Sequence, residues 1–434
     1  MRPGDKHERT VLIVTTLAFA ALTVVMLAAA RNTLFPPVLF AGTWLLTLVG
    51  LIAFGGTLYD VGDYGYLVFL VGACAFCCGG LLTLCVLPHP DSGAPRPRNG
   101  APITRAALDI LLGLLVASFP YYVGVAFRIA GTSETAAAVL AIRRAVIEAE
   151  GDANPFGAVA GNLNVLAGLV AIALVYEADG TWRRRWRAIA GIVVALAYGA
   201  LTGTKGGALL LVTFFFAAQI RVGKIKMAAG LGAIAIALTF FAVGLLAINL
   251  PGRSFEDVRT AAGALSSTFI SYWLGPLVSF GQIAEQPDAL ASSENIGRFF
   301  LQTARSLGLD VTLPSLYEKY TPISADMTNN TYTIYFSYFK DYGWLGMALL
   351  LASLGVFLTI LWARALRGFP VAVLMYAMMC KAIVQSFFNE AFFLGLNGYI
   401  KAYVLYWFLY RLLPSIGGQQ EPGAPAAARS PAPA

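Results

Sequence analysis

The chain has 434 residues, of which 58% are hydrophobic and only 12% are charged. A soluble globular domain carries about one quarter charged residues, so this composition excludes an ordinary soluble protein and indicates a membrane protein. The formal net charge is +7. Because the basic residues lie in short loops between apolar segments, membrane orientation explains this charge better than nucleic-acid binding, and no nucleic-acid partner is expected.

Apolar segments recur along the chain, and a membrane-spanning helix needs about 20 mostly apolar residues. The segments cover residues 10–30, 34–56, 64–87, 105–128, 155–176, 188–203, 206–220, 227–250, 344–363, 370–388 and 392–413. We therefore predict an all-α polytopic membrane domain over residues 1–413, with about 11 spans. The first segment lacks a signal-peptide cleavage pattern and is expected to be a retained span. Residues 414–434, rich in Pro and Ala, are expected to form a disordered tail.

Basic clusters predict the orientation, because Lys and Arg are enriched in cytoplasmic loops. The clusters are residues 183–187, residues 221–226, and Arg364 with Arg367. If all lie inside, the order of spans places two long loops on the outer face, at about 129–154 and 251–342.

The orientation of the N-terminus is ambiguous in the sequence. The order of spans places it outside, whereas Arg2, Lys6 and Arg9 favour the inside. Either one early segment does not span fully or the positive-inside bias is broken there.

Lys205 is the first candidate site residue. The stretch between Arg187 and Arg221 is too long for one span and basic at both ends, which predicts two short helices that turn at the glycine-rich residues 202–207. Each arm reaches only about 24 Å, less than the hydrocarbon core of about 30 Å, so Lys205 is expected within the outer leaflet. Such a cation either snorkels to the headgroups or binds an anion, and the flanking glycines favour anion binding.

Other cations are predicted on short outer helices. Arg143 and Arg144 lie in a helix predicted to begin at Ser133 and to end near Glu150. Arg298 and Arg305 are seven residues apart in a predicted helix over 295–309, so they are expected on one face. Asp109, Lys381 and Lys401 are charges within apolar segments, and Glu390 lies in the short turn between the last two segments. They suit either a structural network or a hydrophilic cavity, and the sequence leaves both open.

A polar and aromatic segment leads into the span that begins near Gly343. Its candidate substrate-binding residues are Asn330, Tyr332, Thr333, Tyr338 and Asp341. These rings, amides and hydroxyls suit either an interfacial aromatic belt with a helix cap or a platform for sugars.

Four segments occur in an order that resembles the oligosaccharide repeat-unit polymerases, the O-antigen polymerase (Wzy-type) family, with the O-antigen ligases as more distant relatives. They are residues 34–40 with Trp44, the turn 202–206, the Gly-Pro segment 272–280, and residues 330–346. The most specific match is Asn330-Thr331-Tyr332-Thr333, followed by Tyr338 and Asp341-Tyr342-Gly343.

Two departures from the family pattern affect what the resemblance implies. Lys205 stands where the family usually carries Arg, and a lysine neutralises a phosphate without forming the bidentate fork. Asn329 stands where the ligases carry His, which favours a polymerase over a ligase.

The resemblance implies a GT-C-like helical bundle in the bacterial inner membrane, with the active site facing the periplasm. The implied glycosyltransferase polymerises undecaprenyl-pyrophosphate-linked oligosaccharides into O-antigen, capsule or exopolysaccharide. It implies a chain-length regulator and a flippase as partners. Because the sequence has no acidic or His cluster with metal-ligand spacing, no metal or other cofactor is expected. O-antigen ligase and lipid-linked glycan transporter or flippase remain the alternatives.

The same resemblance assigns roles to the candidate residues. Lys205, Arg298 and Arg305 would stabilise the departing pyrophosphate as catalytic cations. Arg143, Arg144 and Tyr272 join the aromatic segment as substrate-binding residues. A base is also needed for the attacking hydroxyl; its candidates are Glu294, Asp310, Glu318, Asp326 and Asp341.

Overall fold

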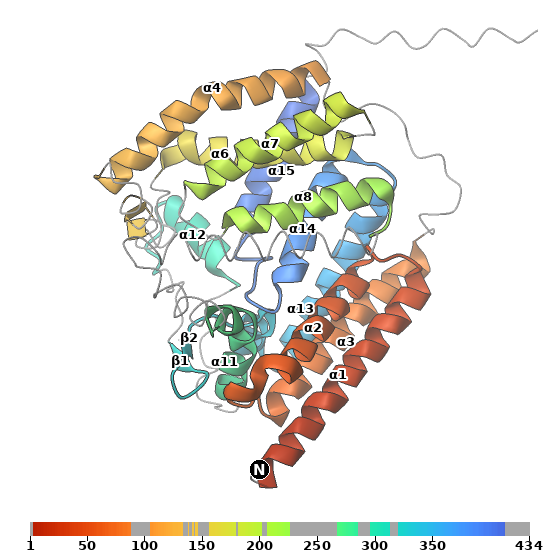
Figure 1. Ribbon diagram of the computed structural model, residues 1–434. Coiled ribbons are helices and arrows are strands. Elements are labelled where there is room, and N and C mark those ends of the chain that lie inside the picture. The colour runs from red at the N-terminus through yellow and green to blue at the C-terminus, as the bar shows by residue number, and fades with distance from the viewer. Residues whose placement is uncertain are drawn as a thin grey trace, which may run out of the picture.

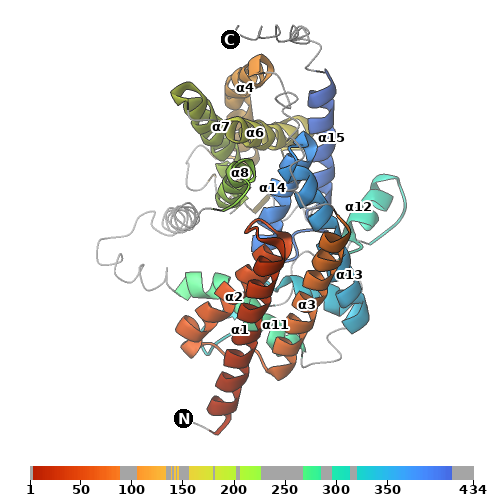
Figure 2. The same ribbon diagram turned by 90° about the vertical axis from the view of Figure 1, so that its right-hand side faces the viewer.

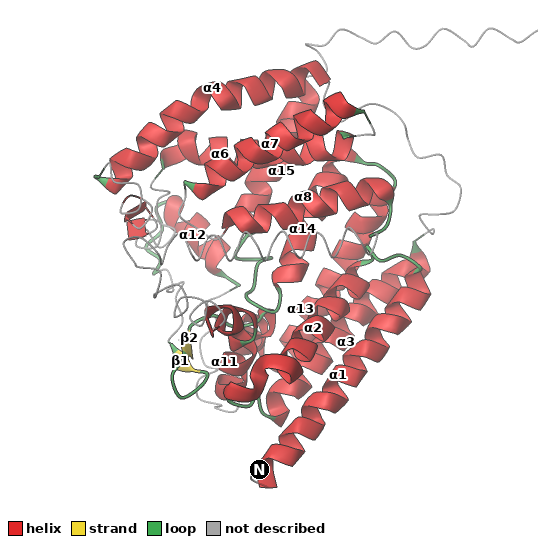
Figure 3. Ribbon diagram, in the orientation of Figure 1, coloured by secondary structure: helices red, strands yellow, loops and turns green. Residues whose placement is uncertain are grey.

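The computed structural model describes residues 3–87, 105–132, 138, 141–142, 144–145, 156–178, 181–201, 206–225, 267–284, 296–312 and 320–412. Within these residues the predicted all-α class is confirmed (Figure 3). The strands described are β1 (Thr321–Pro322) and β2 (Thr328–Asn329), which pair antiparallel with Thr321 opposite Asn329.

One group of helices packs around a small-residue contact. The group comprises α1 (Pro3–Ala30), α2 (Pro36–Phe54), which continues into the 3₁₀ turn η1 (Gly55–Thr57), α3 (Asp63–Val86) and α13 (Ile334–Leu366) (Figure 1). The α3 and α13 backbones touch where Gly79 meets Ala352 and where Gly355 meets Phe76. Glycines let two membrane helices approach this closely.

A second group lies above the first and is inclined to it in both views (Figure 1, Figure 2). It comprises α4 (Arg105–Ala130), α6 (Gly157–Glu177), α7 (Trp182–Ala200) and α8 (Gly206–Val222). Two helices connect the groups: α14 (Pro370–Gln385) packs on α2, α8 and α13, and α15 (Leu396–Leu412) packs on α6 and α14. Pro370 suits the first turn of α14 because that position needs no backbone donor.

Six described helices are long and apolar enough to cross a membrane, and α8 and α14 contain shorter apolar helices. These helices indicate a membrane-embedded protein. The predicted count of 11 spans is not confirmed, because α7 and α15 do not meet the same criterion and the predicted span 227–250 lies outside the described residues. The two predicted short helices on either side of residues 202–205 are present as α7 and α8.

The basic clusters gather at one end of the bundle, which we call the basic end. The Asn32 side chain donates to the Gly223 carbonyl at 2.9 Å, and Arg221 donates to the Tyr176 carbonyl at 3.1 Å. In addition, Phe35 packs against Trp362, two residues before Arg364, with 5.2 Å between ring centroids. Segments far apart in sequence therefore share this end, as the prediction for the clusters requires.

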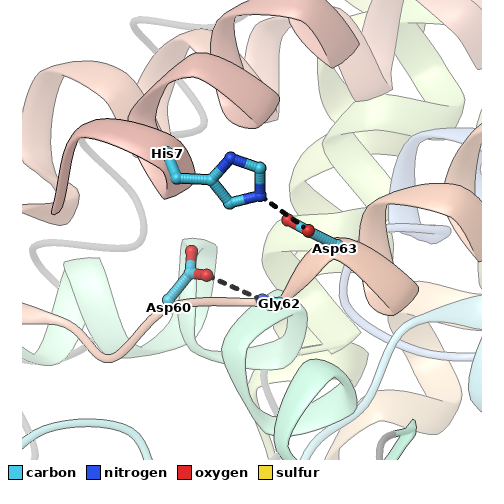
Figure 4. A network of polar contacts seen from close by, with 4 residues as sticks. All are labelled: His7, Asp60, Gly62 and Asp63. Carbon is cyan, nitrogen blue, oxygen red and sulfur yellow. Dashed lines mark hydrogen bonds and ion pairs between the residues drawn. The ribbon is translucent and has the colours of Figure 1, made fainter. Parts of the chain in front are cut away.

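The N-terminus lies at the opposite end, which we call the hairpin end. His7 at the start of α1 contacts Asp63 at the start of α3 at 3.0 Å, and the Asp60 carboxylate accepts from the Gly62 amide beside it (Figure 4). Tyr59 donates to the Ile323 carbonyl of the hairpin at 2.8 Å. Since α1, α2 and α3 are all long enough to span, the early segments place the N-terminus opposite the basic clusters, despite its own basic residues.

The predicted loop over 251–342 contains ordered elements at the hairpin end. Residues 267–273 are helical and are followed by α11 (Gly275–Ala284), which packs on α3, while α12 (Arg298–Ser306) confirms the predicted helix there. Gly343 has φ 62° and divides α13, so the long apolar part begins at Trp344 as the sequence predicts.

Candidate functional site: a polar cavity between the helix groups

A cavity of about 480 Å³ lies between α6, α8, α14 and α15. This volume is typical of ligand pockets, which measure about 300–1,000 Å³. Its polar lining comes from Asn164, Thr213, Lys381, Gln385, Asn389, Glu390 and Tyr399. We call this space the polar cavity, because the helices around it are otherwise apolar.

Local sequence explains why the space is open and why its polar groups converge. Lys381 and Gln385 are four residues apart on α14, so they occupy one helix face. The opposing surfaces carry glycines rather than side chains, at Gly168 of α6, Gly199 of α7 and Gly398 of α15. Because these glycines have no side chain, they leave open space, and the polar groups of α14 face that space.

Glu390 closes one side of the polar cavity and is only 2% exposed. It lies in the connection between α14 and α15 and accepts hydrogen bonds from the Tyr338 hydroxyl at 2.9 Å and from the backbone amides of Phe392, Phe393 and Leu394 at 2.7–3.0 Å. Burial raises the pKa of the Glu390 carboxyl, and these donors oppose that rise. Because both oxygens already accept two or more bonds, Glu390 acts as a structural acceptor that orders the connection.

Several groups in the polar cavity lack partners within the described chain. Thr213 is 2% exposed and Gln385 is 8% exposed, yet neither side chain forms a hydrogen bond with another residue that the structure describes. The buried Asn389 side-chain oxygen also lacks a donor. Lys381 forms no ion pair there, although Glu390 lines the same space. Buried polar groups are normally paired, so this set is suited to a polar ligand or to water.

The four charges Asp109, Lys381, Glu390 and Lys401 have different surroundings in the structure. Lys381 and Glu390 line the polar cavity, which was one of the two alternatives. Asp109 instead forms an ion pair with Arg187 at 2.6 Å rather than with either lysine. Lys401 is exposed on α15. Thr213 and Gln385 were not identified beforehand; their signal was a polar residue inside an apolar helix.

Of the predicted cationic residues, the structure describes Arg144, Arg298 and Arg305. Lys205 and Arg143 lie outside the described residues, although Gly199 and Leu210, described residues on either side of Lys205 in the sequence, line the polar cavity. Arg144 and Arg305 are exposed, whereas Arg298 is 5% exposed. Arg298 and Arg305 thus differ in environment despite their common helix face: one begins α12 next to the buried Ile296, and the other lies in its last turn.

Most of the aromatic segment is buried. Tyr338 is 0% and Tyr332 is 5% exposed, and the Tyr332 ring stacks on Phe336 with 4.3 Å between centroids. Thr333 is buried at the start of α13, and Asn330 keeps intermediate exposure. These rings contribute to packing, and a sugar platform would have to use the remaining polar edge.

Two further candidates connect elements of the hairpin end. The Asp341 carboxylate accepts from the Ile296 amide at 3.0 Å, so it holds the start of α12 against α13. Tyr272 packs against Phe388, with 5.8 Å between ring centroids, and so reaches the α14–α15 connection that carries Glu390.

Comparisons of the chain with protein-family models, with curated proteins and with solved structures found no match.

Proposed function

We propose that this protein polymerises lipid-linked oligosaccharide units, transferring a glycan from undecaprenyl pyrophosphate to a sugar hydroxyl of the next lipid-linked unit. The polar cavity is the observation that carries the proposal. A space of about 480 Å³ that is lined by a lysine, amides and hydroxyls as well as by apolar side chains suits a substrate that is polar at one end and apolar at the other. The resemblance of residues 202–206 and 330–346 to the polymerase family points to the same substrate class.

The reaction needs cations and a base. The acceptor hydroxyl attacks the anomeric carbon, the bond from that carbon to the pyrophosphate oxygen breaks, and the pyrophosphate leaves with the bonding electrons while the hydroxyl proton passes to a base. Cations that stabilise the leaving group lower the barrier. Lys205 remains the first candidate because residues on both sides of it in the sequence line the polar cavity. Lys381 adds a second cation on α14.

The glycan length ladder of a deletion strain tests this proposal. The strain is complemented with wild type, Lys205→Ala or Lys205→Arg at matched abundance in the membrane. We expect Lys205→Ala to leave single-unit product and Lys205→Arg to restore the ladder, because the guanidinium keeps the positive charge. An unchanged ladder in the deletion strain itself would exclude the polymerase.

A flippase for lipid-linked glycans is the second candidate, because a polar cavity among apolar helices also suits transport. The intermediate that accumulates on deletion distinguishes the candidates. A polymerase leaves single repeat units on the outer face, whereas a flippase leaves units on the inner face. Long chains that stay on the lipid carrier would indicate a ligase.

A further inference from the structure

Lys381 is the cation among the residues that line the polar cavity. Its ammonium has no ion-pair or hydrogen-bond partner within the described chain. Glu390 lines the same space, but it forms no ion pair with Lys381, and its oxygens accept bonds from Tyr338 and the amides of residues 392–394. A cation surrounded by apolar helices is costly unless it meets an anion.

The groups around Lys381 are suited to anion binding. Gln385 lies one turn further along the same face of α14, and Thr213 projects from α8 into the same space. Both side chains can donate a hydrogen bond, and both are more than nine-tenths buried without a partner in the described chain. An ammonium with two neutral donors binds a phosphate oxygen well, since charge-assisted hydrogen bonds are about twice as strong as neutral ones.

The remaining walls favour a lipid over a free ion. Ile172 and Leu169 of α6, Leu210 of α8, and Met378 of α14 line the same space. Such a lining accommodates a hydrocarbon chain, which a free hydrated anion lacks, while Asn164, Asn389 and Tyr399 add polar groups to the same walls.

From these observations we infer that Lys381, Gln385 and Thr213 form a subsite for the phosphate group of a lipid. The inference rests on the proposed function, in which the lipid is a prenyl pyrophosphate. The same chemistry would bind the phosphodiester of an anionic phospholipid, and the experiment separates these sources.

The test uses the purified full chain in nanodiscs of phosphatidylcholine, with farnesyl pyrophosphate as the probe and its dissociation constant as the readout. We expect Lys381→Ala to weaken binding by about tenfold or more, since a hydrogen bond to a charged group contributes about 1.5–3 kcal/mol. Lys381→Arg should retain most of the affinity. Lys401→Ala is the matched control, because Lys401 is exposed on α15 and does not line the polar cavity.

Thr213→Val keeps the test valid if Lys381→Ala does not fold, and it should weaken binding several-fold. Adding phosphatidylglycerol to the nanodiscs identifies the source. Binding that resists this lipid indicates a prenyl pyrophosphate, and Lys381-dependent binding of phosphatidylglycerol alone indicates a phospholipid. Equal affinity of wild type, Lys381→Ala and Thr213→Val, or binding of neither probe, would overturn the subsite and leave a cavity that holds water.

Failure of this subsite and failure of the polymerase are distinguishable. Lys381-dependent binding together with an unchanged ladder in the deletion strain keeps the subsite and excludes the polymerase. A ladder that is lost on deletion, together with binding that does not depend on Lys381, keeps the polymerase and excludes the subsite.

Discussion

The Glu390 carboxylate is a structural hydrogen-bond acceptor at one side of the polar cavity. Removing it leaves the amides of Phe392, Phe393 and Leu394 without acceptors, whereas removing the Tyr338 hydroxyl loses one bond. We expect Tyr338→Phe to lower the free energy of unfolding by about 1.5–3 kcal/mol and Glu390→Ala by about 3–5 kcal/mol.

Thermal unfolding of the purified variants in detergent measures whether Glu390→Ala is destabilised more than Tyr338→Phe. Tyr403→Phe is the control, because Tyr403 is 45% exposed on α15. A Glu390→Ala protein that melts with the wild type would show that these bonds do not hold the connection.

Two residues that line the polar cavity were recognisable from the sequence, but the cavity itself was not. Lys381 and Glu390 were recognisable as charges in or next to apolar segments, yet Asp109 and Lys401 looked the same and have other surroundings. The difference depends on residues distant in sequence: Tyr338 precedes Glu390 by 52 positions. The roles assigned to Lys205, Arg143 and the other cations stay predictions.

The contact between α3 and α13 depends on glycine. A Cβ at Gly79 would collide with the Ala352 carbonyl, and a Cβ at Gly355 would collide with the Phe76 carbonyl. We expect Gly79→Ala and Gly355→Ala each to destabilise the protein by about 1–3 kcal/mol, because rigid backbones must separate.

Gly113→Ala on α4 is the matched control, since a Cβ there meets nothing within 4 Å. Unfolding temperatures of the three variants give the comparison. Equal values would mean that the two helices can separate at no cost.

The break in α13 at Gly343 also depends on glycine. Gly343 has φ 62° and ψ −160°, a region that only glycine occupies readily. We expect Gly343→Ala to cost about 1–3 kcal/mol of stability, measured by thermal unfolding against Gly124→Ala, which has open space. A Gly343→Ala protein as stable as Gly124→Ala would show that the break is not needed.

Helix positions were largely predictable, because apolar length and glycine-rich turns are local properties. The start of the long apolar part of α13 and the separate α7 and α8 follow from the sequence. The ordered contacts of α11 and α12 with the ends of α3 and α13 do not, because they join residues through long-range packing.

For the whole molecule, sequence rules conflicted at the N-terminus. Basic residues there favour the side of the other clusters, but α1, α2 and α3 are each long and apolar enough to cross a membrane, which would give an odd number of crossings. The contact of His7 with Asp63 (Figure 4) and the contact of Tyr59 with Ile323 favour the crossing count. We expect burial of three apolar helices to outweigh a few basic residues, since each helix gains far more from the hydrocarbon than a charge bias supplies.

Thiol labelling tests this arrangement in intact cells. In a variant whose native cysteines are replaced, single cysteines are placed at the exposed positions Arg9, Ala325 and Lys224. We expect Arg9→Cys and Ala325→Cys to react alike with a membrane-impermeant reagent, because both lie at the hairpin end. Lys224→Cys lies at the basic end and should react only after the membrane is permeabilised. Labelling of Arg9→Cys together with Lys224→Cys would instead place the N-terminus with the basic clusters, and one of the first three helices would then have to lie along the membrane rather than across it.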